Sequence, residues 1–377
     1  MNDQERRDRL MLARSDGIGP VSFRRLVLRY GSAGAALAAL PELASKSGFT
    51  RFAAPSAAAI DRELAALKKL HGRMLIWGDA DYPAVLADLA DAPPALSILG
   101  GVGLLSRRAV AVVGSRNASI NGLRMAEQLS ADLAEAGLVV VSGLARGIDS
   151  AAHRGAMATG KTVAVVAGGV DVAYPPENAD LQAQIAAAGA VVSEAPLGTD
   201  PQARHFPRRN RIIAGLALGV VVVEAALRSG TLITAREAQD AGREIFAVPG
   251  SPLDPRARGA NDLIRQGATL TESAADVLAH LPERLKAGGL FQSAEFRTSG
   301  LADAQVPYDL AVDEAEEAKK IIPDLLGPTA TDVDDLLRRC QFSASAMMAA
   351  LLELELDGRI ILVAGNRVVL ADDLRRS

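Results

Sequence analysis

Short runs of apolar, mostly β-branched residues recur in the middle of the chain, between about residues 109 and 250. The runs are Ala109–Val113, Leu138–Val141, Thr162–Val166, Ala190–Val192, Val220–Val223 and Ile245–Val248. Helical stretches separate the main runs, for example Asn121–Ala136 and Ile148–Ala158. Strands that are apolar throughout and alternate with helices are typical of a parallel sheet covered on both faces. The pattern therefore predicts an α/β fold with a Rossmann-like, doubly wound parallel sheet, which we assign to residues 76–285.

The first part of the chain, residues 1–75, is rich in Ala and Leu and predicts a small all-helical domain. Two amphipathic stretches, Arg9–Ser15 and Val21–Tyr30, meet at a turn that contains Gly17-Ile18-Gly19. Such a turn is typical of a helix–hairpin–helix, whose exposed backbone amides can contact a phosphate. It is also typical of a tight connection that only packs helices together, and the sequence leaves both interpretations open.

The composition changes again after about residue 285. Residues 286–319 are rich in Gly, Ser, Ala and acidic residues without a sustained period, which predicts a linker. Residues 320–377 contain three helical patches and then the runs Arg359–Val363 and Arg367–Leu370, which together predict a winged helix. Its expected third helix, Ser343–Asp357, carries acidic residues and no basic one, unlike helices that enter the major groove. We expect this domain to contact protein or to serve packing rather than to read duplex DNA.

Composition and charge narrow the class of protein. A chain of 377 residues with 49% hydrophobic and 23% charged residues is expected to form two or three globular domains. The single cysteine, Cys340, excludes a disulfide framework and a four-cysteine metal site. The polar start of the chain and the lack of a membrane-length apolar run predict a cytosolic protein without membrane contact. The net charge of −4 does not exclude nucleic acid, because a local basic groove can still bind it.

Small residues follow several predicted strands, at the ends where doubly wound sheets bind their ligands. These segments are Gly114-Ser115-Arg116, Ser142-Gly143 with Arg146 nearby, Gly168-Gly169, Ser229-Gly230-Thr231 and Pro249-Gly250. Such residues let an anion approach backbone amides and helix N-termini closely, so we expect this edge of the sheet to hold phosphates. Gly155–Thr162 matches the letter of an ATP-binding loop, but a helix precedes it and a strand follows, which is the reverse of the required order. Arg116 stands where a dinucleotide fingerprint needs a glycine, so no NAD, other cofactor or metal is expected.

Nine arginines lie between Pro201 and Arg258 against five acidic residues, a local surplus of four positive charges. The densest part contains Arg204, Phe206, Arg208, Arg209, Asn210 and Arg211. Arginine forks suit phosphate oxygens, and an aromatic ring among them can stack on a base. The alternative is that some of these arginines form structural ion pairs and that Phe206 packs in the core. For the cluster as a whole we favour binding of an anion.

These residues resemble the DNA-processing protein A family, also called Smf, over roughly Trp77 to Ala268. The motifs that carry the resemblance include Ala111–Arg116, Val141–Asp149, Ala152-His153, Tyr174-Pro175, Ser193-Glu194, Phe206–Leu216, Arg228–Ala235 and Val248–Gly250. The resemblance implies an extended Rossmann core that binds single-stranded DNA, dimerises and loads the recombinase RecA in natural transformation. It also implies a sterile-alpha-motif type N-terminal domain and a winged helix. The family's DNA contacts, carried onto this chain, fall on Arg116 and on Arg208–Arg211.

We expect the DNA site to combine the small-residue turns with the arginine cluster. Its residues are Gly114, Ser115, Arg116, Ser142, Gly143, Arg146, Arg204, Phe206, Arg208, Arg209, Asn210, Arg211, Ser229, Gly230 and Thr231. The competing hypothesis is a nucleotide-hydrolysing enzyme, because the sheet also resembles that of phosphoribohydrolases. Their catalytic glutamate aligns with Thr234, which cannot do acid–base work at neutral pH. The remaining candidates for catalysis, Asp149, His153 and Glu224, form no triad that is visible in the sequence. We expect structural roles for Asp149, as a helix cap, and for His153, as a buried residue. We therefore favour a binding protein over an enzyme; a scaffold that binds only proteins is a third, weaker hypothesis.

Overall fold

The computed structural model describes residues 1–47, 53–227 and 229–283, together with short pieces between residues 319 and 370. The chain forms two compact units. The first contains Met1–Ala36 and Ala54–Gln292, and the second contains Leu37–Ala53 and Ser293–Ser377. The N-terminal helices α1 (Asp3–Ala13) and α2 (Pro20–Tyr30) thus belong to the same compact unit as the central sheet.

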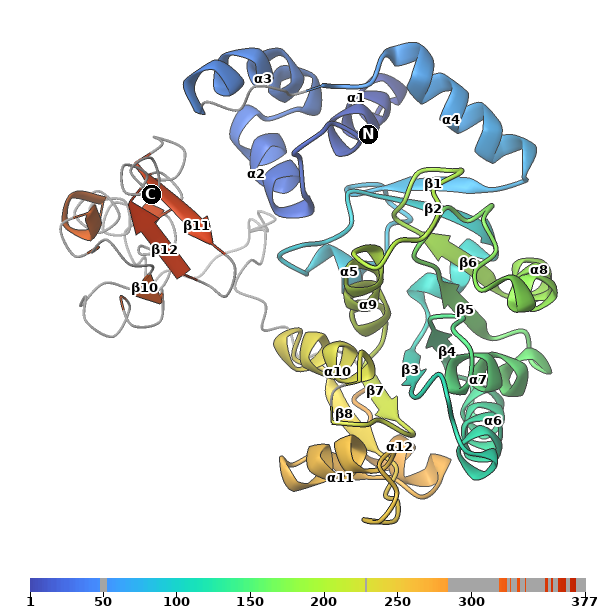
Figure 1. Cartoon of the computed structure of the whole chain (residues 1–377). Coiled ribbons are helices and arrows are strands. Elements are labelled where there is room, and N and C mark those ends of the chain that lie inside the picture. The colour runs from blue at the N-terminus through green and yellow to red at the C-terminus, as the bar shows by residue number, and fades with distance from the viewer. Residues whose placement is uncertain are drawn as a thin grey trace, which may run out of the picture. The chain divides into compact units, whose positions relative to one another are not determined.

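A nine-stranded sheet forms the centre of the first unit (Figure 1). Its strands are β1 (Arg73–Ile76), β2 (Ala95–Gly100), β3 (Ala109–Val113), β4 (Val139–Ser142), β5 (Thr162–Val165), β6 (Ala190–Ser193), β7 (Gly219–Val222), β8 (Glu244–Ala247) and β9 (Thr269–Leu270). Their order is β1-β2-β6-β5-β4-β3-β7-β8-β9. Every neighbouring pair from β6 to β9 is parallel, while β1 and β2 are antiparallel additions at one edge. The six predicted runs are β3 to β8, which confirms the α/β class.

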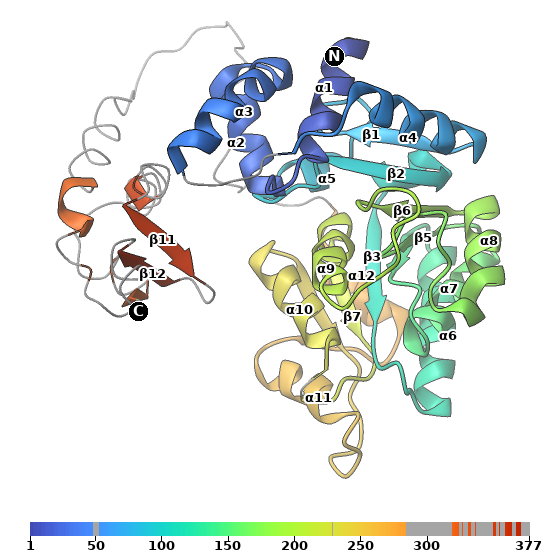
Figure 2. The ribbon, with the colours of Figure 1, turned by 45° about the horizontal axis from the view of Figure 1, so that its top comes forward.

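The N-terminal helices cover the β1 and β2 end of this sheet (Figures 1 and 2). Leu10 of α1 is fully buried in one cluster with Ile60 of α4 (Ala57–Lys69) and with Met74 of β1. The guanidinium carbons of Arg9 and Arg24 lie 5.6 and 5.3 Å from the centre of the Trp77 ring, which follows β1. Apolar burial and cation–π contacts therefore fix α1 and α2 against the sheet.

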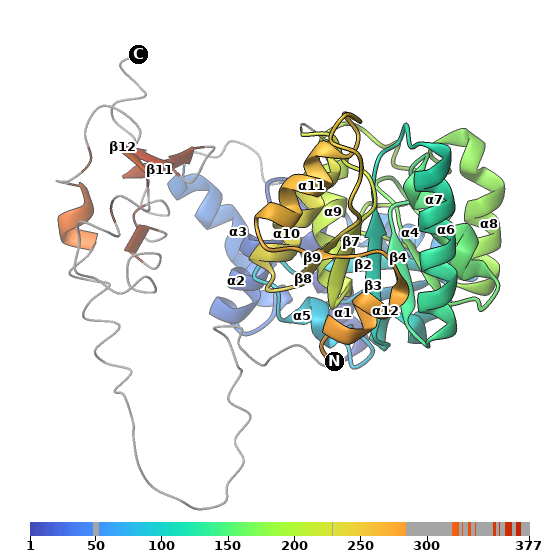
Figure 3. The same cartoon turned by 90° about the horizontal axis from the view of Figure 1, so that it is seen from below.

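Helices cover both faces of the sheet, as Figure 3 shows from below. The helices after β1 are α5 (Ala84–Ala87), α6 (Ile120–Glu135), α7 (Ile148–Met157), α8 (Ala179–Ala188), α9 (His205–Leu216), α10 (Thr231–Asp240), α11 (Arg258–Arg265) and α12 (Ala274–His280). Alternate strand residues divide between the faces: Val110 and Val112 pack with α6, α7 and α12, and Ala111 and Val113 with α9, α10 and α11. Successive side chains of a strand point to opposite faces of its sheet, so a strand that is buried on both faces contributes to both clusters.

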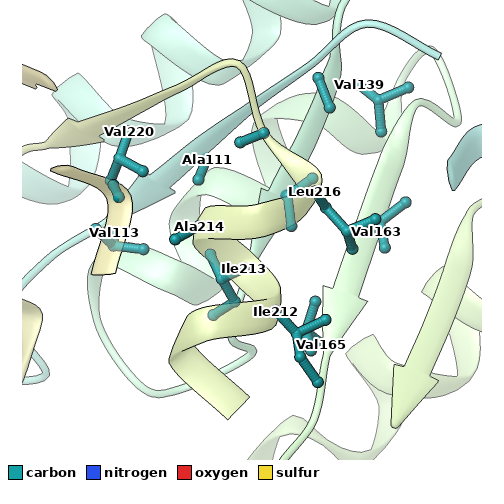
Figure 4. Packing of buried hydrophobic residues seen from close by; sticks show 14 of the residues in the cluster. Ala111, Val113, Val139, Val163, Val165, Ile212, Ile213, Ala214, Leu216 and Val220 are labelled. Carbon is teal, nitrogen blue, oxygen red and sulfur yellow. The ribbon is translucent and has the colours of Figure 1, made fainter. Parts of the chain in front are cut away.

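The helix that carries the arginine cluster, α9, is anchored by its apolar residues (Figure 4). Ile212 and Ile213 are each 1% exposed and pack with Val163 and Val165 of β5. Burying such a side chain contributes about 1.5–3 kcal/mol, so these two residues alone hold the helix firmly on the sheet. The position of the cluster over the strand ends is therefore set by the core.

The segment that resembles an ATP-binding loop has the local structure expected from its flanking elements. Helix α7 precedes it and β5 follows it, and Gly160 adopts a φ of +64° after the end of the helix. This left-handed conformation suits a glycine that ends a helix. The segment is therefore a helix end and not a phosphate loop.

The second unit contains a small sheet of order β10-β12-β11. Strands β11 (Ile360–Val363) and β12 (Arg367–Leu370) pair antiparallel, and β10 (Thr331–Asp332) adds to β12, which agrees with the predicted winged helix. Of the expected helix Ser343–Asp357, the structure describes only Ala350, Leu351 and Leu354, and all three are buried. The acidic residues of that helix, Arg338, Arg339, Cys340 and residues 286–318 of the predicted linker lie outside the described residues.

Candidate nucleic-acid interface

A pocket lies at the carboxyl ends of β3, β4 and β5, where the sequence predicted a phosphate-binding edge. It is lined by Arg116 after β3, by Gly143 and Arg146 after β4, by Gly168 after β5, and by Phe206 and Arg209 of α9. Tyr174, from the loop between β5 and α8, also lines it. We call this site the Phe206 pocket. It brings together residues from four separate parts of the chain.

The centre of the pocket is an aromatic ring surrounded by cations. The guanidinium carbons of Arg116 and Arg209 lie 4.9 and 6.0 Å from the centre of the Phe206 ring. The ring of Tyr174, which is 45% exposed, lies 5.8 Å from that of Phe206 at an angle of 55°. Phe206 is only partly buried, so the alternative that it packs in the core does not hold. This arrangement can stack on a base and place positive charge beside its phosphate.

Four of the predicted arginines are exposed: Arg116, Arg146, Arg204 and Arg208. Arg146 lies 3.5 Å from Glu177, but both side chains are more than half exposed, and such a pair contributes little. Among the described residues, Arg116 and Arg208 have no acidic partner within ion-pair distance. Their charges are therefore available to a bound anion.

Arg209 is 6% exposed and serves the protein itself. Its Nη1 donates hydrogen bonds to the carbonyl of Gly143 and, at 2.7 Å, to that of Val165, and its Nε donates to Asn210. These bonds join the ends of β4 and β5. Burial lowers the pKa of Arg209 to about 10, so it stays charged at neutral pH. Burial also raises the pKa of the nearby Asp149 carboxyl, and the charge of Arg209 opposes that shift.

Arg211 also serves an internal role, since it is 9% exposed. Its Nη2 lies 2.6 Å from both carboxylate oxygens of Glu194, and its Nη1 donates to the carbonyl of Asp91 at 2.5 Å. Arg209 and Arg211 are buried because α9 enters the interior after its first turn. Every residue from 209 to 216 except Asn210 is buried. Arg208–Arg211 was expected to contact DNA as one stretch. Within it, only the side chain of Arg208 is exposed and Asn210 is half-buried, while Arg209 and Arg211 are buried.

The small residues on the β3 and β4 turns are packed against protein atoms. A Cβ on Gly114 would come within 2.5 Å of Ile148, and one on Gly143 would overlap the guanidinium of Arg209. Ser142 is fully buried and donates to the carbonyl of Val112 at 2.7 Å. These residues are small because other parts of the chain fill the space, and not in order to leave room for a phosphate. Ser115 is partly exposed beside Arg116, and its Oγ accepts from the Asn117 amide at 3.2 Å.

The turn after β7 does not line the Phe206 pocket. Thr231 Oγ1 donates to the carbonyl of Gly114 at 3.0 Å, and Ser229 Oγ donates to Thr231 Oγ1 at 3.0 Å. This contact joins the turns after β3 and β7, the two strands between which the strand order of the sheet reverses. Gly230 remains exposed and open, with no atom within 4 Å of a Cβ placed on it. Arg228 lies outside the described residues.

The residues considered for catalysis have structural contacts. Glu224 accepts hydrogen bonds from the amide and hydroxyl of Ser119, at 3.0 and 2.5 Å, and so holds the first turn of α6. Asp149 lies in the first turn of α7 and accepts from the amide of Ala145 at 3.4 Å. His153 is fully buried with its Nδ1 2.7 Å from Thr162, and burial lowers its pKa to about 3. Thr234, the position of the expected glutamate, is 3% exposed.

Sequence reasoning missed two features of this site. The sequence identifies Tyr174 only as part of the motif Tyr174-Pro175, and nothing in the spacing of the chain places it against Phe206. The burial of Arg209 was also missed. Its neighbours in the structure, Gly143 and Asp149, belong to another motif of the resemblance, Val141–Asp149, but the sequence does not show that they surround it. In addition, within the part of the chain that the structure describes, no helix is long and apolar enough to span a bilayer.

Comparisons with known proteins cover most of the chain. A sequence profile for the family described as DNA recombination-mediator protein A matches residues 73–282. Profiles for a DprA-like N-terminal HHH domain and a DprA winged helix domain match residues 3–66 and 306–366. The chain is 49% identical to DNA processing protein DprA of Streptococcus pneumoniae over 202 residues, which are 53% of this chain and 71% of that protein. It is 40% identical to protein Smf of Escherichia coli over 300 residues, 78% of this chain and 76% of that protein.

Two solved structures resemble the chain. The X-ray structure of DNA processing protein A from Streptococcus pneumoniae aligns with a TM-score of 0.58 at 39% identity, over 67% of this chain and 83% of that one. A structure of DNA processing protein A from Helicobacter pylori, described for its single-stranded DNA binding mode, aligns with a TM-score of 0.51 at 28% identity. That alignment covers 56% of this chain and 96% of the other.

Proposed function

The chain belongs to the DNA recombination-mediator protein A family, and from that premise we propose that it binds single-stranded DNA, without sequence preference, at the Phe206 pocket. The observation that carries the proposal is the partly exposed Phe206 ring with the guanidiniums of Arg116 and Arg209 within 6.0 Å of its centre. An aromatic face stacks on any base, and arginine forks bind the backbone phosphates that every nucleotide carries, so neither contact requires a particular sequence. The Helicobacter pylori relative, described for its single-stranded DNA binding mode, supports the same ligand class.

The predicted site residues divide into two groups in this proposal. Those that contact the strand are Arg116, Arg146, Arg204, Phe206 and Arg208, with Ser115, Asn210 and Gly230 at the margin; Tyr174, which the sequence did not predict, joins them. Those that shape the site are Gly114, Ser142, Gly143, Arg209, Arg211, Ser229 and Thr231, since their polar groups or missing side chains are engaged by the protein. A duplex fits this pocket poorly because its bases are not available for stacking. We therefore expect single-stranded DNA to bind more tightly than duplex DNA.

The process that we infer is protection of incoming single strands and their transfer to the recombinase RecA in natural transformation, by a homodimer that is not an enzyme. The names of the DNA-processing relatives support a role in handling DNA. A nucleotide-hydrolysing activity has less support, because Glu224 is held by Ser119 and Thr234 is buried. Release of free base from nucleoside monophosphates by the purified protein would overturn this part of the proposal.

The test compares the wild-type protein with Phe206→Ala in binding to oligo-dT and to a duplex of the same length. Losing one stacked base costs about 1–3 kcal/mol, so we expect the affinity for oligo-dT to fall by about tenfold or more. Leu253→Ala is the matched control, since that side chain is 91% exposed and lies outside the Phe206 pocket. Equal affinities of Phe206→Ala and the control for oligo-dT would overturn the proposed site.

A further inference from the structure

A second cavity, of about 580 Å³, lies beside the Phe206 pocket. One wall is the turn between α1 and α2, Arg14–Pro20, and the other consists of residues after β5 and β6 and of α9. We call it the hairpin cavity. Val166, Ala167 and Arg209 line both this cavity and the Phe206 pocket. The two spaces are therefore neighbours that share a wall, and Arg209 presents its charge at that wall.

The helical turn is fixed to the sheet edge and is not a loose lid. Arg14 Nη1 donates to the carbonyl of Glu194, just after β6, at 2.9 Å, and its Nη2 lies 2.8 Å from Glu63. Both side chains of this ion pair are largely buried, with 10% and 13% of their surface exposed. The hairpin cavity is therefore a preformed feature of the first compact unit.

The charges around the hairpin cavity favour binding of a group with a single negative charge. Arg14 is neutralised by Glu63, and Glu194 by Arg211 at 2.6 Å. His205 accepts a hydrogen bond from the Gln202 amide, and desolvation together with Arg204 and Arg208 lowers its pKa, so it is neutral. What remains is positive charge on Arg208 and Arg209 against one exposed carboxylate, that of Asp16.

The remaining walls are mostly apolar. Ile18, Pro94, Pro196 and Ile212 contribute to the lining, and the volume lies within the range of about 300–1,000 Å³ that is usual for small-ligand sites. A cleft that combines apolar walls with a surplus of one positive charge suits a nucleotide, whose base is flat and apolar on its faces and whose phosphate carries one negative charge within a strand.

We propose that the hairpin cavity holds the nucleotide next to the one stacked at Phe206, so that the bound strand continues beneath the α1–α2 turn. This inference rests on the proposed function of the Phe206 pocket and extends it to the N-terminal helices. It decides between the two interpretations that the sequence left open for Gly17-Ile18-Gly19: the turn contacts DNA as well as packing helices. The N-terminal helices then lengthen the binding site by at least one nucleotide.

Gly19 provides a selective probe of the hairpin cavity. It lines the cavity, has an ordinary φ of −83°, and a Cβ on it would meet no atom within 4 Å. Gly19→Leu should therefore fill the cavity without backbone strain, and Gly19→Ala should leave most of it open. Gly103→Leu is the matched control, because Gly103 is exposed, is equally free of neighbours within 4 Å, and lies outside both cavities.

The experiment measures competition by oligo-dT of increasing length, from about 4 to about 16 nucleotides, the range of site sizes of single-strand binders. We expect Gly19→Leu to bind the long oligomers about tenfold more weakly than Gly19→Ala and Gly103→Leu, and to bind the shortest ones as they do. Equal binding by Gly19→Leu and Gly103→Leu at every length would overturn the inference, as would an equal loss at every length. The proposed function fails only if Phe206→Ala binds oligo-dT like the wild type. Failure of the inference at Gly19 can therefore be distinguished from failure of the proposed function.

A second measurement uses the unmodified protein and so does not depend on the folding of a variant. Oligo-dT that contains the photoreactive base 4-thiothymine is irradiated with the wild-type protein, which is then digested with trypsin. We expect cross-links in the peptide Ser15–Arg24, which spans the turn. Cross-links to Phe206 or Tyr174 without any to this peptide would contradict the inference while supporting the proposed function.

Discussion

At the scale of the residue, the arginine cluster separates into charges that face solvent and charges that hold the protein together. Arg116 and Arg208 are exposed, whereas Arg209 and Arg211 are buried and bonded to carbonyl groups and a carboxylate. The sequence predicted the cluster but not this division. Burial depends on where α9 enters the core, and the order of residues within Arg208–Arg211 does not reveal that depth.

The division predicts unequal effects of two arginine substitutions on stability. Arg209→Ala leaves the buried carbonyls of Gly143 and Val165 without a donor, so we expect the free energy of unfolding to fall by about 2–4 kcal/mol. Arg116→Ala removes an exposed side chain, and we expect a change within about 0.5 kcal/mol. Denaturant unfolding of both variants measures the difference, and equal stabilities would contradict it.

The buried His153 predicts a loss of stability in mild acid. Its folded pKa of about 3 lies below the ordinary value of 6.5, so between these values the unfolded chain binds a proton that the folded chain excludes. Stability should therefore fall as the pH drops from about 6.5 towards 3, by up to about 1.4 kcal/mol per pH unit from this group. His153→Gln should flatten that slope in urea unfolding series. His71→Asn, at an exposed position with a φ of +55°, should keep the wild-type slope, and a slope unchanged by His153→Gln would exclude this explanation.

At the scale of the element, the apolar runs predicted β3 to β8 because those strands are buried on both faces. Strands β1 and β2 were missed, since they join antiparallel at one edge, where β2 pairs with β6 and β1 with β2, and these pairings depend on tertiary contacts. The small residues lie at the strand ends as predicted, but Gly114 and Gly143 are small for a different reason from the predicted one. A sequence does not show which atom occupies the space of an absent Cβ, and here Ile148 and Arg209 occupy it at Gly114 and Gly143.

Two glycines of these turns should therefore respond differently to the same substitution. Gly143→Ala forces a Cβ onto the Arg209 guanidinium, and we expect a loss of about 1–3 kcal/mol of stability and weaker DNA binding. Gly230→Ala meets no atom within 4 Å at a φ of −59°, so its melting temperature should match the wild type within about a degree or two. Thermal unfolding of the pair checks this, and a larger loss for Gly230→Ala would show that packing was assigned to the wrong glycine.

At the scale of the whole molecule, the sequence predicted the kinds of domain, and the structure joins two of them more closely than expected. Helices α1 and α2 belong to one compact unit with the sheet, and the Trp77 ring contacts one arginine from each of those helices. This docking depends on single long-range contacts such as Arg14 with Glu194, which leave no periodic signal in the sequence. The boundaries at residues 75, 285 and 319 remain predictions, as do the homodimer and the transfer to RecA.

We propose that two exposed arginines hold phosphates of a bound single strand: Arg116, which lines the Phe206 pocket, and Arg208, which lines the adjoining hairpin cavity. This claim is tested most directly by the salt dependence of oligo-dT binding for the wild type, Arg116→Ala, Arg208→Ala and the control Arg265→Ala, whose exposed arginine pairs with Asp262 on α11. The plot of log K against log salt falls with a slope of about −0.7 for each phosphate contact with a single strand. Each of the two site variants should therefore bind more weakly and show a slope that is less steep by about 0.7. The control should keep the wild-type slope. Slopes that are equal in all four proteins would contradict the account.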